Sequence, residues 1–196
     1  MKHCQLRYKI TNSIITVIKN HVIGELLIGE PESSTSKSIE ESISKFNKEY
    51  NSFIKEFPES AQQWEAQIDG EIMLQTPDIL SISFSSYMNT GGAHGNLNIT
   101  FLNFDSLTGN HINNDALFNN IECVKAVAEQ YCKVEIEEKE SLFDADSFSL
   151  PANIGYSEEG VILLYNTYEI APYSTGFIEF SIPFNEVNDF LVFNSL

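Results

Sequence analysis

Apolar and polar residues alternate most regularly between residues 81 and 105, on both sides of a short glycine-rich segment. Alternation with a period of two is typical of a β-strand with one buried face. The segment 89–96 contains Gly91, Gly92 and Gly95, and glycine adopts backbone conformations that other residues resist. The pattern predicts a β-hairpin whose turn needs these glycines for its backbone. Because two strands alone are marginally stable in water, the hairpin should belong to a larger sheet.

The segments before the hairpin also show strand-like patterns. Apolar and polar residues alternate over residues 3–10, which predicts a half-buried strand with Cys4 as a small buried residue. Residues 14–27 follow as a second β-rich run, and residues 64–76 as a third, with Asp69-Gly70 as a turn or a bulge.

Between these runs the sequence predicts one long helix. Ser38 and Glu41 match a capping box, in which each side chain satisfies a backbone N–H of the first turn. Apolar residues then recur at spacings of three and four over residues 39–57, which predicts an amphipathic helix that covers a sheet. A coiled coil would need more heptads than this segment holds. Three side chains of the stripe are predicted to be buried: Ile43, Phe46 and Phe53.

The second half of the chain repeats this mixture of strands and one long helix. Asn113 offers a cap for a short helical turn, and Asn120 caps a helix with an apolar face. The acidic run that follows, residues 135–146, is typical of a solvated face. Strands are predicted at 152–156, 161–165 and 177–182, and a short helix follows Pro183.

These patterns predict an α+β protein with antiparallel sheets, each packed against a long helix. We expect two halves, residues 1–105 and 106–196, that form one compact unit.

The amino-acid composition excludes some classes of binding partner, but it does not indicate a catalytic activity. The formal net charge of −17 argues against nucleic acids and anionic membranes, and it would steer a cationic partner towards the protein. The acids could equally serve only to keep the surface solvated. No apolar run reaches the ~18–20 residues of a membrane span, and the first residues lack the apolar region of a signal peptide. The cysteines show no metal-binding spacing, and Cys123 and Cys132 are too far apart on a helix to bridge.

Two motifs carry a resemblance to a known family. The sequence YMNTGGAHGN, residues 87–96, resembles the signature that closes the N-terminal region of a bacterial extracytoplasmic family of unknown function, also found beside peptidoglycan deacetylase domains. The sequence YEIAPYSTG, residues 168–176, resembles the signature of its usual C-terminal companion domain. The order and spacing of the two motifs also agree with that family, and together the two regions cover nearly the whole chain.

The resemblance implies a periplasmic or cell-surface protein of α+β architecture, typically a lipoprotein in Gram-negative relatives. Its best understood relative is the sensor region of a lysozyme-responsive anti-sigma factor, whose paired domains bind lysozyme directly. The present chain shows no anti-sigma segment, no membrane span and no deacetylase domain with metal-binding side chains. The resemblance therefore implies a binding module, and whether a lipid anchor precedes it stays open.

Catalysis has one candidate residue in the motifs. His94 could act as a base with Asp105 or Glu169 as its orienting carboxylate. The sequence contains no nucleophile elbow, phosphate loop or zinc-binding helix motif to accompany it. A histidine between glycines can also be a turn residue that bonds backbone, or a ligand contact.

The loop of residues 171–176 is the second candidate site. Pro172 stiffens it, and Tyr173 presents a rigid aromatic surface with a polar tip, which suits both protein hot spots and sugar platforms. The alternative is a plain connection in which Tyr173 covers the core. We expect a non-enzymatic envelope protein without metal or cofactor that binds a lysozyme-like cationic protein, with peptidoglycan or another glycan as the alternative ligand and hydrolysis through His94 as a further one. The expected partner-binding residues are Tyr87, His94, Tyr168, Pro172 and Tyr173.

Overall fold

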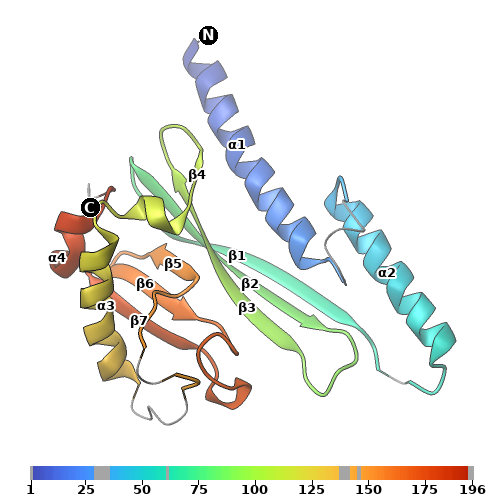
Figure 1. Ribbon diagram of the computed structural model, residues 1–196. Helices are drawn as coiled ribbons and strands as arrows, with labels where there is room; N and C mark the ends of the chain where they lie inside the picture. Colours follow the sequence, from blue (N-terminus) through green and yellow to red (C-terminus); the bar gives the residue numbers. More distant parts are fainter. Residues whose placement is uncertain (1, 29–35, 61, 137–141, 145–146, 194–196) are drawn as a thin grey trace. The chain divides into compact units, whose positions relative to one another are not determined.

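The computed structural model describes the chain except for residues 1, 29–35, 61, 137–141, 145–146 and 194–196. The described residues form a mixed α+β protein with two open antiparallel sheets, as predicted (Figure 1). They divide into two compact units, each made of separate chain segments. The first unit comprises Met1–Asp69 and Ser85–Leu97, and the second comprises Gly70–Phe84 and Asn98–Leu196. The predicted boundary between residues 105 and 106 stays a prediction.

The first two predicted strands are wrong, because residues of both lie in one helix, α1 (Lys2–Glu25). From residue 9 onward, where side chains are described, Ile10, Ile14, Ile18 and Val22 recur at intervals of four and are each half-buried. That spacing places them on one helix face, but the many β-branched residues also suit a strand, and the shorter period was chosen wrongly. Cys4 belongs to this helix, and its side chain lies outside the described residues.

The predicted long helix is present as α2 (Ile39–Glu56). Ser38 Oγ accepts a hydrogen bond from the Glu41 N–H at 3.1 Å, as the capping box requires. The Glu41 carboxylate reaches one residue further than expected and accepts from the Lys37 N–H at 2.8 Å. Phe46 is buried and Phe53 is half-buried, but the prediction for Ile43 is wrong, since 46% of it is exposed. The buried position beside it is Ser42, so the inner face of the helix is rotated slightly from the apolar stripe.

A four-stranded sheet follows, in the order β1-β2-β3-β4. Its strands are β1 (Glu65–Gln75), β2 (Ile79–Asn89), β3 (Asn96–Asp105) and the short β4 (His111–Ile112). The predicted hairpin is therefore confirmed as β2 and β3. Asp69 and Gly70 lie inside β1 and do not form a turn. Gly70 is needed for space, since a Cβ there would lie 2.8 Å from the ring of Phe84.

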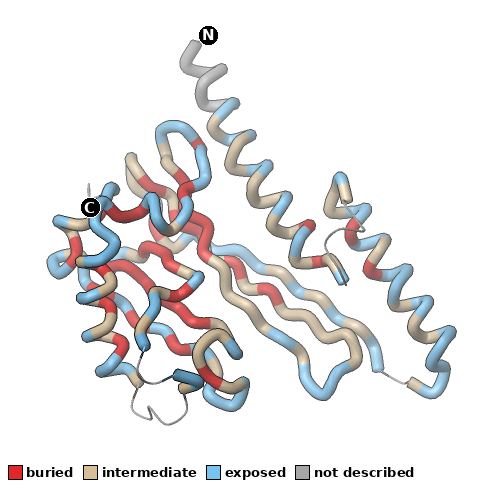
Figure 2. Tube along the Cα trace, in the orientation of Figure 1, coloured by how far each residue is buried: buried red, intermediate tan, exposed pale blue. Residues whose placement is uncertain are grey.

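The C-terminal elements of the second unit hold most of the buried side chains. The 3-10 turn η2 (Asn114–Leu117) precedes α3 (Ile121–Glu135), whose Cys123 N–H donates to the predicted cap, Asn120 Oδ1, at 3.2 Å. The second sheet has the order β5-β6-β7, and Figure 2 shows buried residues concentrated along it. Its strands are β5 (Asn153–Tyr156), β6 (Gly160–Tyr165) and β7 (Ile178–Pro183). The short helical turns α4 (Phe184–Val187) and η5 (Asn188–Phe190) follow β7.

Polar side chains join the two sheets inside the second unit. Asn103 of β3 donates to the Ile154 carbonyl of β5 at 2.8 Å, and Ser81 Oγ of β2 accepts from the Tyr156 N–H at 3.0 Å. Both contacts are buried, where a hydrogen bond avoids the cost of an unpaired backbone group. These bonds fix the second sheet against the first within this unit.

Three further expectations can be compared with the fold. Cys123 and Cys132 are both free, as their helical separation predicts. Much of the acidic run, at 137–141 and 145–146, lies outside the described residues. Among the helices that the structure describes, none combines the length and the apolar character needed to cross a bilayer.

Candidate functional site

The three glycines of the turn between β2 and β3 differ in whether, and why, a side chain would be unfavourable. Gly91 has a positive φ of 95°, and its N–H donates to Asn89 Oδ1 at 3.1 Å, so the prediction of special backbone geometry is confirmed there. Gly95 has no positive φ, but a Cβ on it would collide with the ring of Tyr87. Gly92 has neither constraint, because the nearest atom to a Cβ there is 3.7 Å away.

The turn lies over an aromatic cluster in the first unit. Trp64 packs against Phe46, Tyr50 and Phe53 of α2, with ring centroids 5.8, 5.7 and 5.3 Å apart. The position of a Cβ on Gly91 is 3.4 Å from Trp64 Nε1, so the turn approaches the indole closely. The first motif therefore covers the apolar centre of its own unit.

The two predicted site residues of the first unit serve this turn. The ring of Tyr87 is half-buried against Gly95. His94 is exposed, and its Nδ1 lies 3.0 Å from the Gly95 carbonyl oxygen. A carbonyl oxygen only accepts, so Nδ1 carries the proton in this contact. The geometry favours the interpretation of His94 as a turn residue.

The carboxylates considered as partners of a catalytic histidine hold backbone in place. Asp105 Oδ1 accepts from the N–H groups of Leu107 and Thr108 at 2.8 and 2.9 Å. Glu169 accepts from the Ala152 N–H at 2.8 Å and from the Asn166 N–H at 2.9 Å. Both carboxylates therefore have a structural role, which is to accept hydrogen bonds from the backbone. In the described part of the chain, no group of three histidine, cysteine or acidic side chains could hold a metal ion.

The other predicted site residues lie together in the second unit, in residues 166–177, which we call the aromatic loop. The rings of Tyr168 and Tyr173 face each other with centroids 5.7 Å apart and planes inclined by 36°. Tyr168 is 57% exposed and Tyr173 36%, so both rings present one side to solvent. Pro172, half-buried, comes directly before the 3-10 turn η4 (Tyr173–Thr175) and fixes its entry. The alternative in which Tyr173 mainly covers the core fits this exposure poorly.

The aromatic loop is anchored at its base by the side chain of Asn166 and by a backbone hydrogen bond. Asn166 bonds both backbone groups of Ile99 in β3, accepting from its N–H at 2.8 Å and donating to its carbonyl at 2.9 Å. The Glu169 N–H in turn donates to the Asn166 carbonyl at 3.1 Å, and this closes a tight turn around Tyr168. The loop is therefore held to β3 before that tyrosine by Asn166, and to Ala152, next to β5, after it by Glu169.

Tyr168 has an unusual backbone for its residue type. Its φ is 69°, and it is the only residue other than glycine with a positive φ in the described part of the chain. Turns that require a positive φ at this third position ordinarily use glycine or asparagine, and a bulky residue there costs roughly 1–3 kcal/mol. An exposed aromatic residue thus occupies a strained backbone position.

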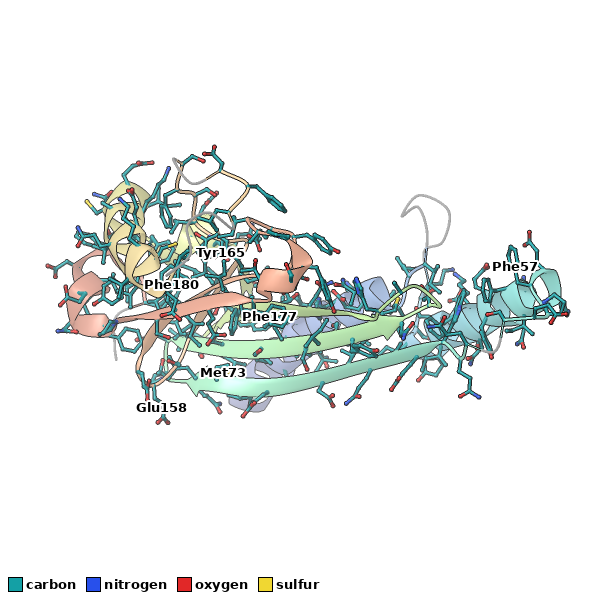
Figure 3. The ribbon with its side chains drawn as sticks, turned by 90° about the horizontal axis from the view of Figure 1, so that it is seen from below. Phe57, Met73, Glu158, Tyr165, Phe177 and Phe180 are labelled. Atoms are coloured by element: carbon teal, nitrogen blue, oxygen red, sulfur yellow. The ribbon has the colours of Figure 1, made fainter. Side chains whose placement is uncertain are left out.

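The sequence reasoning missed several features around this loop. Phe143 is 64% exposed and its N–H donates to the Ile170 carbonyl at 2.9 Å, which brings a distant aromatic residue beside the loop. Phe177, labelled in Figure 3, is 37% exposed at the end of the loop. The only sequence signal for either was an apolar residue in a polar context. The anchoring roles of Asn166 and Glu169 had no signal, since both depend on residues distant in sequence.

Comparison with known proteins assigns the two regions separately. A sequence profile described as "Deacetylase PdaC" matches residues 10–97. A second profile, described as a protein of unknown function, DUF3298, matches residues 112–185. The chain belongs to the two-part family that joins these regions. The PdaC region thus ends one residue after the first motif, and the DUF3298 region contains the whole aromatic loop.

Solved structures of DUF3298 proteins have the same fold. One from Bacteroides fragilis is 21% identical, with a TM-score of 0.76 over 95% of this chain and 80% of that one. Another, from Pseudomonas aeruginosa, is 18% identical, with a TM-score of 0.63 over 93% of this chain and 80% of that one. No curated protein matches the sequence significantly. At these identities the structures establish the fold alone, and the relation to a lysozyme-binding sensor stays a prediction.

Proposed function

We propose that this DUF3298 protein is a non-enzymatic binding module of the cell envelope, outside the cytoplasm, and that the aromatic loop is its partner-binding surface. The observation that carries the proposal is Tyr168, an exposed aromatic residue held in a backbone conformation that disfavours it. Strain of this kind accumulates where function requires a particular side chain, because selection for stability alone would remove it. A plain connecting loop would place glycine or asparagine there.

The composition of the loop supports protein recognition. Tyrosine is enriched at binding hot spots, since it offers a large rigid area with a polar tip and loses little entropy when bound. The loop presents Tyr168 and Tyr173 as one exposed pair, and its anchors to Ile99 reduce the cost of ordering it. The net charge of −17 favours a cationic partner. Lysozyme, which the resemblance implies, is the first candidate.

The experiment is a calorimetric titration with purified lysozyme at low and at physiological salt. We expect Tyr168→Ala and Tyr173→Ala each to weaken binding by at least about thirtyfold, the size of a hot spot. Leu107→Ala, which truncates a side chain that is 65% exposed outside the loop, is the matched control and should bind normally. If the wild type binds no better than an unrelated protein of equal negative charge, or if both tyrosine variants bind normally, the lysozyme proposal fails.

A glycan ligand is the second candidate, because a pair of neighbouring tyrosine rings also suits sugar stacking. Salt separates the two partners. Binding of a basic protein should weaken as ionic strength screens exposed charges, whereas stacking of a neutral sugar on Tyr168 and Tyr173 should hardly change. Peptidoglycan fragments titrated at both salt concentrations give this comparison directly.

A further inference from the structure

A cavity of about 220 Å³ lies in the second unit, next to the aromatic loop. Its walls come from α3, β6, the segments on either side of residues 145–146, and Ile170 of the loop itself. The Phe143 N–H bonds the Ile170 carbonyl, so the cavity and the loop share a backbone contact. Nothing in the sequence patterns indicated this cavity.

The most buried part of the cavity, its inner end, is lined by side chains that carry no charge. Cys132 and Tyr165 line it and are only 6% and 2% exposed. Tyr165 Oη already donates to the Ser149 carbonyl at 2.6 Å. Burial raises the pKa of both the Cys132 thiol and the Tyr165 phenol, so both stay neutral at physiological pH. An entering negative charge would meet no basic side chain there, and both carboxylate oxygens of Glu169 already accept from backbone N–H groups, so an apolar group fits better.

The charged side chains of the cavity lining are acidic. Asp144 and Glu169 line it, Glu169 close enough to Tyr165 for its charge to help raise the pKa of that phenol, and among the described lining residues none is basic. Asp144 is exposed, so it lies where the cavity opens to solvent, which we call the mouth. Its carboxylate accepts a hydrogen bond from Ser147 Oγ at 2.8 Å. A positive charge beside the entering group would therefore be attracted, and a negative one repelled.

The volume sets the size of the occupant. Sites for drug-sized ligands and cofactors usually measure about 300–1,000 Å³, so this cavity is too small for them. An apolar cavity of about 150 Å³ already holds a benzene molecule. A space of about 220 Å³ is therefore suited to one large apolar side chain.

We propose that the cavity is a subsite that receives one apolar side chain of a basic polypeptide, with the positive neighbours of that side chain lying against Asp144. The inference rests on the proposed function of the aromatic loop and specifies the chemistry of its partner. In this arrangement Tyr168 and Tyr173 contact the partner's surface, and the cavity takes one anchor residue from the same partner beside them.

The test uses the whole chain and three capped tripeptides: Lys-Phe-Lys, Lys-Ala-Lys and Glu-Phe-Glu. Burial of a phenylalanine ring corresponds to at least about tenfold in affinity, so Lys-Phe-Lys should bind at least about tenfold more tightly than Lys-Ala-Lys. It should also bind more tightly than Glu-Phe-Glu, most clearly at low salt. Equal binding of Lys-Phe-Lys and either other peptide, or no binding of Lys-Phe-Lys, would overturn the proposal.

Variants locate the binding. Cys132→Leu and Ile170→Trp fill the cavity from two different elements and should abolish binding of Lys-Phe-Lys while the chain still unfolds cooperatively. Asp144→Asn keeps the shape of the mouth and should weaken binding about two- to fivefold, as expected for one exposed charge pair. Glu158→Gln removes the same charge from the turn before β6, at the other end of that strand from Tyr165, and should bind normally.

The two proposals can fail separately. Tyr173→Ala should leave tripeptide binding unchanged, because its ring does not line the cavity. Tripeptide binding without lysozyme binding would retain the subsite and reject the lysozyme partner. The opposite result is also possible: the wild type binds lysozyme through Tyr173 but binds no tripeptide, and a folded variant with a filled cavity still binds lysozyme. That result would reject the subsite and retain the loop. If one filled variant fails to fold, the other variant and Asp144→Asn still decide.

Discussion

The backbone of Tyr168 can be tested by replacing the residue with glycine and with alanine. Both changes remove the ring and its contact with Tyr173 at 5.7 Å, so that loss cancels in the comparison. They differ in the backbone, where φ is 69°. Alanine keeps the left-handed strain of roughly 1–2 kcal/mol, and glycine removes it.

The expected difference follows from two opposing terms. Relief of strain stabilises the glycine variant, but the more flexible unfolded chain offsets this by about 0.5–1 kcal/mol. Tyr168→Gly should therefore be more stable than Tyr168→Ala by about 0.5–1 kcal/mol. For a chain of this size that difference corresponds to a Tm higher by about 1–4 °C.

The assay is urea denaturation of both variants, with thermal unfolding as a second measure. The matched control is the same pair of changes at Tyr173, which lies in a 3-10 turn, where glycine should be the less stable of the two. If Tyr168→Gly is no more stable than Tyr168→Ala, the strained turn is refuted. If either Tyr168 variant keeps the partner affinity of the wild type, the ring is not part of the binding surface.

Three further outcomes follow from the packing. Gly91→Val should destabilise the protein measurably in urea, because its φ is 95° and Trp64 lies 3.4 Å from the added Cβ, whereas Gly92→Ala should be nearly neutral. Phe46→Ala should cost about 3–5 kcal/mol of unfolding free energy, and Ile43→Ala, at a largely exposed position, less than about 1 kcal/mol. His111 is exposed as a whole, but partial desolvation of its ring lowers its pKa below the ordinary value of 6.5, so the unfolded chain takes up the proton first as pH falls. Stability should therefore drop below about pH 6.5, and His111→Gln should remove a small part of that drop in urea unfolding at pH 7.5 and 5.5.

The sequence determined the elements whose signals are local. The hairpin at residues 81–105 has a strict period of two and a glycine-rich turn, and α2 has a cap and a stripe that agree with each other. Where two local signals conflicted, the prediction failed. In α1 the β-branched residues favoured a strand, while the spacing of Ile10, Ile14 and Ile18 belonged to a helix. Ile43 failed for a related reason, since a stripe gives the apolar face of a helix but not how far the helix turns that face inward.

The candidate site was only partly accessible from the sequence. The motif of residues 168–176 directed attention to Tyr168, Pro172 and Tyr173, and in the structure the rings of the two tyrosines lie side by side, while their role in binding stays a prediction. The positive φ of Tyr168 could not be inferred, because sequence would assign such a conformation to glycine or asparagine. It exists because Asn166 is bonded to Ile99, 67 residues away in sequence, and Glu169 to Ala152.

The cavity was decided by tertiary structure alone. Cys132 reads as an ordinary small apolar residue of a helix face, and Tyr165 as the last residue of a buried strand. Their meeting with Asp144 and Ile170 around one space depends on how α3, β6 and two connecting segments pack. A local pattern encodes which face of an element is apolar, but the volume left between elements depends on all their distances and side-chain sizes together. For this protein the sequence therefore determined most of the elements and pointed to the aromatic loop, while the fold alone created the strain in Tyr168 and the space beside it.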